Sequence, residues 1–233
     1  MIATSSGCAS LPPGSVRDPR DHFERFNRAM WKFDTDLDRA VMRPVARGYV
    51  TTVPAPLRTG VSNFLGNLAY TSTIGNDLLQ GNLRDFGRDL ARLIVNTSIG
   101  IGGLFDPAST LGLVKHERDF GQTLGIWGVP TGSYLVLPLL GPTDFRDAIG
   151  TVLDRFMTVD GYITNTTLNV SLFSARAVNE RAEALPEDST IDSAYDPYAF
   201  VRSAWFQLRA YKVHEGQKDY LPSLPPLDGG SHK

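Results

Sequence analysis

The sequence predicts an all-α protein with a single helical domain, and three features of the 233-residue chain support this. Apolar residues recur at steps of three and four along most segments, which is the period of an amphipathic helix. Asp-Pro pairs at residues 18–19 and 196–197 each supply an N-cap followed by proline at the first helical position. Strand-like alternation is brief everywhere, and no internal repeat is visible.

The first helix is expected to run from Asp18 to Arg43. Pro44 should end it, because proline lacks the amide hydrogen and collides with the preceding turn. One face carries an apolar stripe, which consists of Phe23, Phe26, Met30, Phe33, Leu37 and Val41. We expect this stripe to pack into the core, and contact with a membrane surface is the alternative.

Two further helices are expected on either side of residues 79–82. The first follows a break at residues 52–56, and the second begins at Asn82, a candidate N-cap. The second carries Arg84, Arg88 and Arg92 at four-residue steps. Such a stripe predicts either a solvated face, paired with nearby aspartates, or contacts with anionic lipid head groups.

Glycine is concentrated in two segments, residues 98–107 and 119–142. The first contains neither a G-x-G-x-x-G pattern nor a Walker lysine, which argues against a nucleotide-binding loop. We therefore expect it to form a tight turn between helices. The second holds five glycines among apolar side chains. It is too rich in glycine for an exposed helix and too apolar for an exposed loop. Two hypotheses remain open for it: an irregular hairpin buried in the core, or a hairpin that lines a cavity or touches lipid.

The C-terminal half is predicted to be helical from Thr143 onward. Its first helix has one apolar face, formed by Phe145, Ile149, Val152 and Phe156. A more polar helix runs toward Leu185, residues 186–189 form an acidic surface loop, and the last helix opens at Asp196. The helical domain therefore spans residues 18–215, between a tail at 1–17 and a Pro/Gly-rich tail at 216–233.

Composition excludes several classes of protein. The chain has 23 Lys and Arg against 25 Asp and Glu, a formal net charge of −2, so it lacks the excess positive charge of nucleic-acid-binding proteins. No apolar run approaches the ~18 residues that a membrane-spanning helix needs. A single cysteine, Cys8, excludes an intramolecular disulfide. The small residues before Cys8 are typical of a bacterial lipoprotein processing site, and an unmodified thiol is the alternative.

The sequence contains no recognisable catalytic pattern. None of the four histidines lies in an H-E-x-x-H motif, and no G-x-S-x-G elbow occurs. His116 and Glu117 are expected to form a solvated pair in a polar turn. We therefore expect neither an enzyme nor a protein that needs a metal ion or another cofactor.

Ordered motifs along most of the chain resemble the MlaA/VacJ family of outer-membrane lipoproteins. The most specific is Asp-Phe-Gly-Gln-Thr-Leu-Gly-Ile-Trp-Gly-Val at residues 119–129. The others lie at residues 26–33, 43–46, 53–58, 63–68, 79–81, 96–103, 137–138, 146–147, 196–198 and 202. The resemblance covers residues 18–211 in order and without large gaps.

The resemblance implies a disc-like protein in the periplasmic leaflet of the outer membrane of a Gram-negative bacterium, anchored by a lipid on Cys8. It also implies a central amphipathic channel that removes mislocalised phospholipid from the outer leaflet and so maintains lipid asymmetry. The implied partners are phospholipid, an outer-membrane porin trimer and a soluble periplasmic lipid carrier of the MlaC type.

Within that framework, the glycine-rich hairpin is the candidate for part of the channel wall. Its candidate lining residues are Trp127, Tyr134, Leu135, Leu137, Leu139 and Leu140. The candidate head-group contacts are Arg84, Arg88 and Arg92. The alternative function is a helical envelope scaffold that binds a porin and moves no lipid. A lipid hydrolase is a third hypothesis, which would require release of fatty acid.

Overall fold

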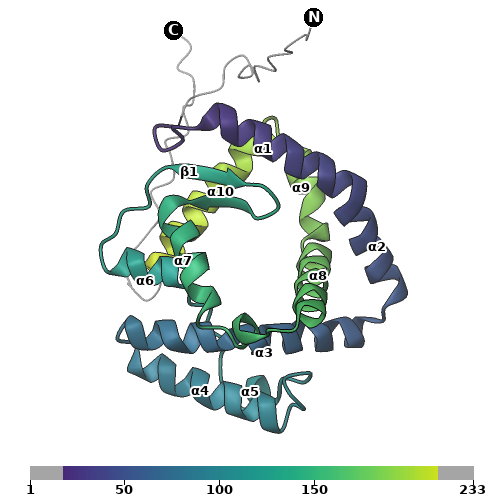
Figure 1. Ribbon diagram of the computed structural model, residues 1–233, viewed down its shortest axis with the longest axis vertical. Coiled ribbons are helices and arrows are strands. Elements are labelled where there is room, and N and C mark those ends of the chain that lie inside the picture. The colour runs from purple at the N-terminus through teal and green to yellow at the C-terminus, as the bar shows by residue number, and fades with distance from the viewer. Residues whose placement is uncertain (1–17, 215–233) are drawn as a thin grey trace, which may run out of the picture.

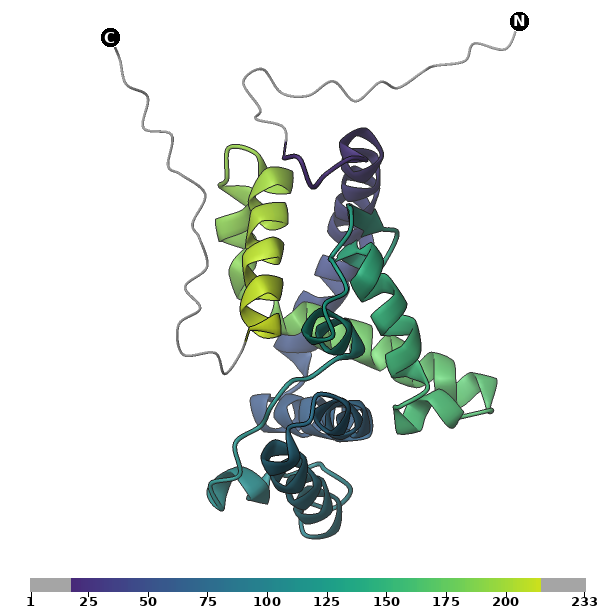
Figure 2. The same ribbon diagram turned by 90° about the vertical axis from the view of Figure 1, so that its left-hand side faces the viewer.

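The helices of this protein are arranged in a ring, as the computed structural model shows for residues 18–214 (Figure 1). The elements are α1 (Glu24–Leu37), η1 (Asp38–Met42), α2 (Arg43–Thr52), α3 (Ala55–Leu79), α4 (Leu83–Ser98), α5 (Pro107–Thr110), α6 (Phe120–Ile126), β1 (Tyr134–Leu137), β2 (Gly141–Asp144), α7 (Phe145–Arg155), η2 (Val159–Tyr162), α8 (Thr166–Glu183), η3 (Leu185–Glu187), α9 (Asp188–Asp192) and α10 (Pro197–Val213). The prediction of an all-α fold is confirmed, and the ring agrees with the implied disc-like shape apart from one corner that projects (Figure 2).

The first helical segment differs from the prediction at both ends. Residues 18–23 form turns, in which the amide of Arg20 donates to Asp18 Oδ1 over 2.9 Å, and α1 begins only at Glu24. Pro44 does not end the helix. A turn of π-helix, η1, precedes it, and Pro44 itself lies in the first turn of α2. Prolines and π-helical turns are both places where a long helix bends without ending. The result is one long curved edge of the ring (Figure 1).

Helices α3 and α4 form an antiparallel pair at the opposite edge of the ring (Figure 1). Asn82 precedes α4 as predicted, although its side chain makes no capping hydrogen bond. The glycine-rich segment after α4 forms the predicted tight turn. Gly103 has φ of +91°, and a Cβ there would lie 2.4 Å from Cβ of Asn67, so the turn can pack against α3 only with glycine.

The glycine-rich segment 119–142 is not one irregular hairpin. Its first part forms α6, which Asp119 caps by accepting a 2.8 Å hydrogen bond from the amide of Gln122. The glycines of this part let α6 cross α7 closely, because a Cβ on Gly150 would lie 2.4 Å from the backbone nitrogen of Gly121. The second part forms an antiparallel hairpin, in which Tyr134 of β1 pairs with Asp144 of β2.

The C-terminal half follows the predicted order with small shifts. Helix α7 starts after Asp144, which accepts a 2.7 Å hydrogen bond from the amide of Asp147. The predicted acidic loop at residues 186–189 instead falls within η3 and α9, since ion pairs of Asp188 hold this segment against α8. Asp196 caps α10 as predicted, accepting from the amide of Ala199 over 3.2 Å.

The apolar core is small and mostly aromatic. Tyr134, Val136, Tyr198 and Phe206 are buried together, and Trp205 packs against them. The ring of Tyr134 lies 5.5 Å from that of Phe206 and 5.6 Å from that of Trp205, measured between centroids. This cluster joins α1, the hairpin and α10.

Candidate functional site

The polarity of buried and exposed side chains is the reverse of that in a protein folded in water: many buried side chains are polar, and many exposed ones are apolar. Among residues 18–214, ten hydrophobic residues are buried, whereas twenty polar or charged residues are buried and 35 large hydrophobic residues are exposed. In water such a surface is unfavourable, and extended apolar patches mark contact with a membrane or a partner. The distribution therefore indicates an apolar environment around much of the ring.

Helix α1 shows this reversal most clearly. Its buried residues are Glu24 and Asn27, whereas Phe26 and Phe33 are about half exposed, at 49% and 51%. The prediction that its apolar stripe packs into the core is therefore wrong for Phe23, Phe26, Phe33 and Val41, whereas Met30 packs against the aromatic core. Helix α7 is similar, since Asp147 is buried and Val152 is 61% exposed. The polar stripe on each helix was visible in the sequence, but its place inside the protein was not.

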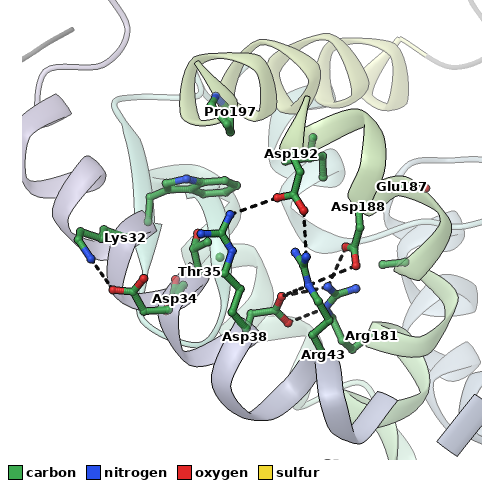
Figure 3. A pocket seen from close by; sticks show the side chains of 16 residues that line it. Lys32, Asp34, Thr35, Asp38, Arg43, Arg181, Glu187, Asp188, Asp192 and Pro197 are labelled. Atoms are coloured by element: carbon green, nitrogen blue, oxygen red, sulfur yellow. Dashed lines mark hydrogen bonds and ion pairs between the residues drawn. The ribbon is translucent and has the colours of Figure 1, made fainter. Parts of the chain in front are cut away.

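A pocket of about 580 Å³ lies between the α1–α2 edge and the α8–α9 segment (Figure 3). Its size lies within the range of ligand pockets. Trp31 and Ala184 line it, and Gly141 brings the tip of the hairpin to its rim. The pocket thus borders the hairpin at the residue that follows its two exposed leucines, Leu139 and Leu140.

The charged wall is a network of arginines and aspartates (Figure 3). Arg181 pairs with Asp38 at 2.6 Å and with Asp188 at 2.8 Å, and Arg43 pairs with Asp192 at 2.9 Å. Burial would raise the pKa of Asp38, but the pairs with Arg181 and Arg43 outweigh burial and hold its pKa below the usual value. Asp38 therefore stays ionised, and the ion pairs of this network join α1–α2 to α8–α9 across the pocket.

The hairpin is fixed to α1 at two points. Near its base, Asn27 donates to the carbonyl oxygen of Tyr134 over 2.9 Å and accepts from the amide of Val136 over 3.0 Å. At its tip, the amide of Leu139 donates to Asp34 Oδ1 over 2.9 Å. Leu139 and its neighbour Leu140 remain 71% and 66% exposed. Two apolar side chains therefore lie next to a pocket whose lining includes both charged and apolar residues.

The other predicted lining residues are distributed differently. Tyr134 is fully buried in the aromatic core, so the prediction that it lines a channel is wrong. Leu135 and Leu137 are partly buried on the alternate face of β1. Trp127 is 54% exposed next to α6, where its Nε1 donates to the carbonyl oxygen of Leu79 over 3.2 Å. Its role as a lining residue stays a prediction.

The arginines of α4 do not form one surface stripe. Arg84 and Arg88 are exposed, and their contact with head groups stays a prediction. Arg92 is only 5% exposed, and its guanidinium pairs with Asp106 at 2.5 Å and donates to the carbonyl oxygen of Leu113. Arg92 therefore holds α5 to α4 and is not available to a head group, which corrects that prediction.

A buried acidic cluster between α3 and α4 was not predicted. His116 is not a solvated residue, because its Nδ1 lies 2.9 Å from Oδ2 of the buried Asp89. Tyr70 donates its hydroxyl hydrogen to Asp89 Oδ1 over 2.7 Å. Burial, together with the neighbouring Asp89, raises the pKa of Asp77 to about 7. The signal in the sequence was the recurrence of Asp85, Asp89, Arg92 and Asn96 along one face of α4.

Residues 18–214 contain neither a membrane-spanning helix nor a cluster of metal-binding side chains. No helix there is both long enough and apolar enough to span a bilayer. No group of three or more histidine, cysteine, aspartate or glutamate side chains in that range could hold a metal ion. The predicted tails at 1–17 and 216–233 lie outside the described residues, and so does Cys8, the predicted lipid anchor. Residue 215, the last residue of the predicted helical domain, is outside them too.

Comparison with known proteins gives consistent similarities. A family model described as MlaA lipoprotein matches residues 19–212. The chain is 33% identical to the intermembrane phospholipid transport system lipoprotein MlaA of Haemophilus influenzae, over 93% of this chain and 90% of that protein. It is 35% identical to the protein of the same name from Escherichia coli, over 91% of this chain and 85% of that protein.

One solved structure is also similar to this fold. It comes from work on the structural basis for maintenance of bacterial outer membrane lipid asymmetry. The two chains are 34% identical, with a TM-score of 0.75, and the match covers 83% of this chain and 98% of the other.

Proposed function

Because this chain belongs to the MlaA lipoprotein family, we propose that it takes part in intermembrane phospholipid transport. In this proposal it removes mislocalised phospholipid from the outer leaflet of the outer membrane and so maintains lipid asymmetry. The observation that carries the proposal is the reversed distribution of polarity, with apolar side chains outside and charged side chains inside. An apolar exterior suits acyl chains, and a charged interior suits a head group that would be costly to bury in hydrocarbon.

The proposed route for the head group follows the charged wall of the pocket. The ion pairs of Arg43 and Arg181 supply fixed donors and acceptors there, so a phosphate or an ammonium group can exchange hydrogen bonds with water for hydrogen bonds with protein. The acyl chains follow the apolar tip of the hairpin at Leu139 and Leu140. Leu135, Leu137 and Trp127 extend this apolar surface in the proposal.

The location and partners complete the proposal. A lipid on Cys8 anchors the chain to the periplasmic leaflet of the outer membrane, where amphipathic helices can lie without spanning the bilayer. An outer-membrane porin trimer adjoins the ring, and a soluble carrier of the MlaC type receives the lipid. The exposed Arg84 and Arg88 contact anionic head groups at the membrane surface. No covalent bond is made or broken, so the proposed activity is transport and not catalysis.

The first experiment identifies the lipid. We expect mass spectrometry of the detergent-extracted protein to detect bound phospholipid, and deletion of the gene to increase phospholipid in the outer leaflet. Absence of bound phospholipid together with intact asymmetry in the deletion strain would overturn the proposal.

A second experiment separates transport from a scaffold role. Ala184→Trp fills part of the pocket, whereas Ala175→Trp places the same side chain on an exposed position of α8, the helix that ends just before Ala184. We expect Ala175→Trp to restore lipid asymmetry in the deletion strain. Ala184→Trp should not restore it, although it reaches the membrane at the wild-type level. If Ala184→Trp restores asymmetry fully, the pocket is not the route, and the scaffold function is favoured.

A further inference from the structure

A second pocket lies beside the end of α8, near the corner of the ring where α2 meets α3 (Figure 1). It has a volume of about 310 Å³ and is lined by residues of α2, α3 and α8, so we call it the α2–α3–α8 pocket. Asn179 and Glu183 line it, whereas Arg181 and Ala184 line the pocket described above. The two pockets therefore lie on different faces of the end of α8.

The cation of this pocket, Arg58, differs from the other arginines inside the ring. It lies in the first turn of α3 and is partly buried, and its Nε is buried without a hydrogen-bond partner. Within residues 18–214, every other arginine that is not exposed forms an ion pair with an aspartate, whereas Arg58 pairs with no carboxylate. Withdrawing an unpaired guanidinium from water is unfavourable, so the position of Arg58 indicates a negatively charged ligand.

The other polar groups of the lining suit a phosphate. A guanidinium presents its donors in a planar fork that matches two phosphate oxygens. The hydroxyl of Tyr49 lies in the same lining and donates to Asn179 Oδ1 over 3.4 Å, a long hydrogen bond that a phosphate oxygen can replace. The volume of the pocket is at the lower end of the range for small ligands, which suits a head group without its acyl chains.

Glu183 limits the charge that the pocket accepts. Arg58 and Glu183 are the two charged side chains of the lining, so a dianionic phosphate would be repelled by Glu183, whereas a phosphodiester carries a single negative charge. Oε1 of Glu183 accepts from Oγ of Ser62 over 2.7 Å and from Nδ2 of Asn179 over 2.9 Å. Its other oxygen, Oε2, accepts no hydrogen bond within residues 18–214, which leaves it available to an ammonium group.

These observations together identify the chemistry of the ligand. We propose that the α2–α3–α8 pocket binds a zwitterionic phosphodiester head group, with the phosphate on Arg58 and the ammonium group on Glu183. Phosphatidylethanolamine has this chemistry, whereas phosphatidylglycerol lacks the ammonium group. The pocket is then a second head-group site, separate from the charged wall of Arg43 and Arg181. This inference rests on the proposed function, which supplies a phospholipid as the ligand.

Binding of lipids to the purified full chain tests the site. Ala184→Trp is the parent variant, because Ala184 lines only the other pocket and tryptophan fills part of it. Arg58→Gln is added to this parent, and Arg47→Gln is the matched control, because Arg47 is an exposed arginine of α2 that lines neither pocket. Native mass spectrometry in dodecyl maltoside gives the Kd for phosphatidylethanolamine, phosphatidylglycerol and inorganic phosphate.

We expect Arg58→Gln to weaken the binding of phosphatidylethanolamine about tenfold, since a charged hydrogen bond is lost, and Arg47→Gln to leave it unchanged. Equal binding by these two variants would overturn the proposal. The parent should bind phosphatidylethanolamine several-fold more tightly than phosphatidylglycerol, and Glu183→Gln should remove this difference. Equal affinity of the parent for the two lipids would overturn the role of Glu183. Equal affinity for phosphatidylethanolamine and inorganic phosphate would overturn the assignment to a lipid head group.

Circular dichroism of the lipid-free protein separates a binding role of Arg58 from a structural one. Because Arg58 has no ion pair within residues 18–214, Arg58→Gln should unfold within about 2 °C of the parent. A midpoint lower by more than about 5 °C would show that Arg58 pairs within the chain, and would overturn the proposal. If Arg58→Gln does not fold, Arg58→Lys takes its place and should weaken phosphatidylethanolamine binding a few-fold, because lysine lacks the planar fork. Unchanged binding by Arg58→Lys would then overturn the proposal.

The failure of this inference can be told apart from the failure of the proposed function. If Arg58→Gln binds phosphatidylethanolamine as the control does while the deletion strain still loses lipid asymmetry, only this inference fails. If the deletion strain keeps its lipid asymmetry, the proposed function fails whatever lipid the pocket binds.

Discussion

Replacing Asn27 with alanine tests how the hairpin is held beside the pocket. Asn27 is fully buried, and its side chain makes three hydrogen bonds. Two of them reach backbone groups of Tyr134 and Val136, which are themselves fully buried. The third reaches Oδ1 of Asp21, whose other oxygen, Oδ2, keeps Tyr198 and Arg202 as partners after the substitution.

The expected magnitude follows from these contacts. Each buried backbone group left without a partner costs about 1–3 kcal/mol, so the two groups together cost about 2–6 kcal/mol. For a chain of this length, each kcal/mol lowers the midpoint of thermal unfolding by about 2–4 °C. Asn27→Ala should therefore lower the midpoint by about 10 °C, and the loss should be concentrated at the hairpin.

Two measurements on the protein in detergent check this. Circular dichroism gives the midpoint of thermal unfolding, and hydrogen exchange followed by mass spectrometry gives the protection of the Val136 amide. Asn63→Ala is the matched control, because Asn63 makes one 3.4 Å hydrogen bond to Leu104 at an exposed position and should change stability by less than about 0.5 kcal/mol. The reasoning is refuted if Asn27→Ala unfolds within about 2 °C of the wild type, or if the Val136 amide exchanges as slowly as before.

Two further predictions concern other parts of the ring. Because burial, with a contribution from Asp89, raises the pKa of Asp77 to about 7, its stabilising contribution is present below about pH 4 and is lost as the pH rises through 7. Asp77→Asn should therefore gain stability relative to the wild type between pH 5 and pH 8, and a constant difference in unfolding midpoint would contradict this. Gly150→Ala should destabilise the protein by about 1–3 kcal/mol, because its Cβ would lie 2.4 Å from the nitrogen of Gly121. In contrast, a Cβ at position 66 would have no atom within 4 Å, so Gly66→Ala should be neutral or stabilising in the same unfolding assay. Equal effects of Gly150→Ala and Gly66→Ala on stability would refute the close contact between Gly150 and Gly121.

Local patterns in the sequence correctly predicted much of the secondary structure. The Asp-Pro pair at residues 196–197 opens α10 as expected, because the aspartate caps the helix and proline fits its first turn. The break at residues 52–56 separates α2 from α3. These features depend on neighbours in sequence, so a single sequence is enough to locate them.

Features that depend on distant contacts could not be predicted in this way. Pro44 continues the helix because a π-helical turn precedes it, and no local pattern indicated that turn. Helix α6 tolerates its glycines because Gly121 lies against Gly150 of α7. His116 and Asp89 meet only because the chain after α5 returns to α4.

By itself, the sequence indicated most of the helices, which of their faces are apolar and which are polar, and, through its resemblance, the family. Only the tertiary structure decided which face points inward. The periodicity of Phe26 and Phe33 against Glu24 and Asn27 defines two faces of α1, but it carries no information about the medium around the helix. The usual assignment assumes water outside, where burying apolar surface is favourable. In this ring the buried side chains form hydrogen bonds and ion pairs with one another, which leaves the apolar faces to an environment that is itself apolar.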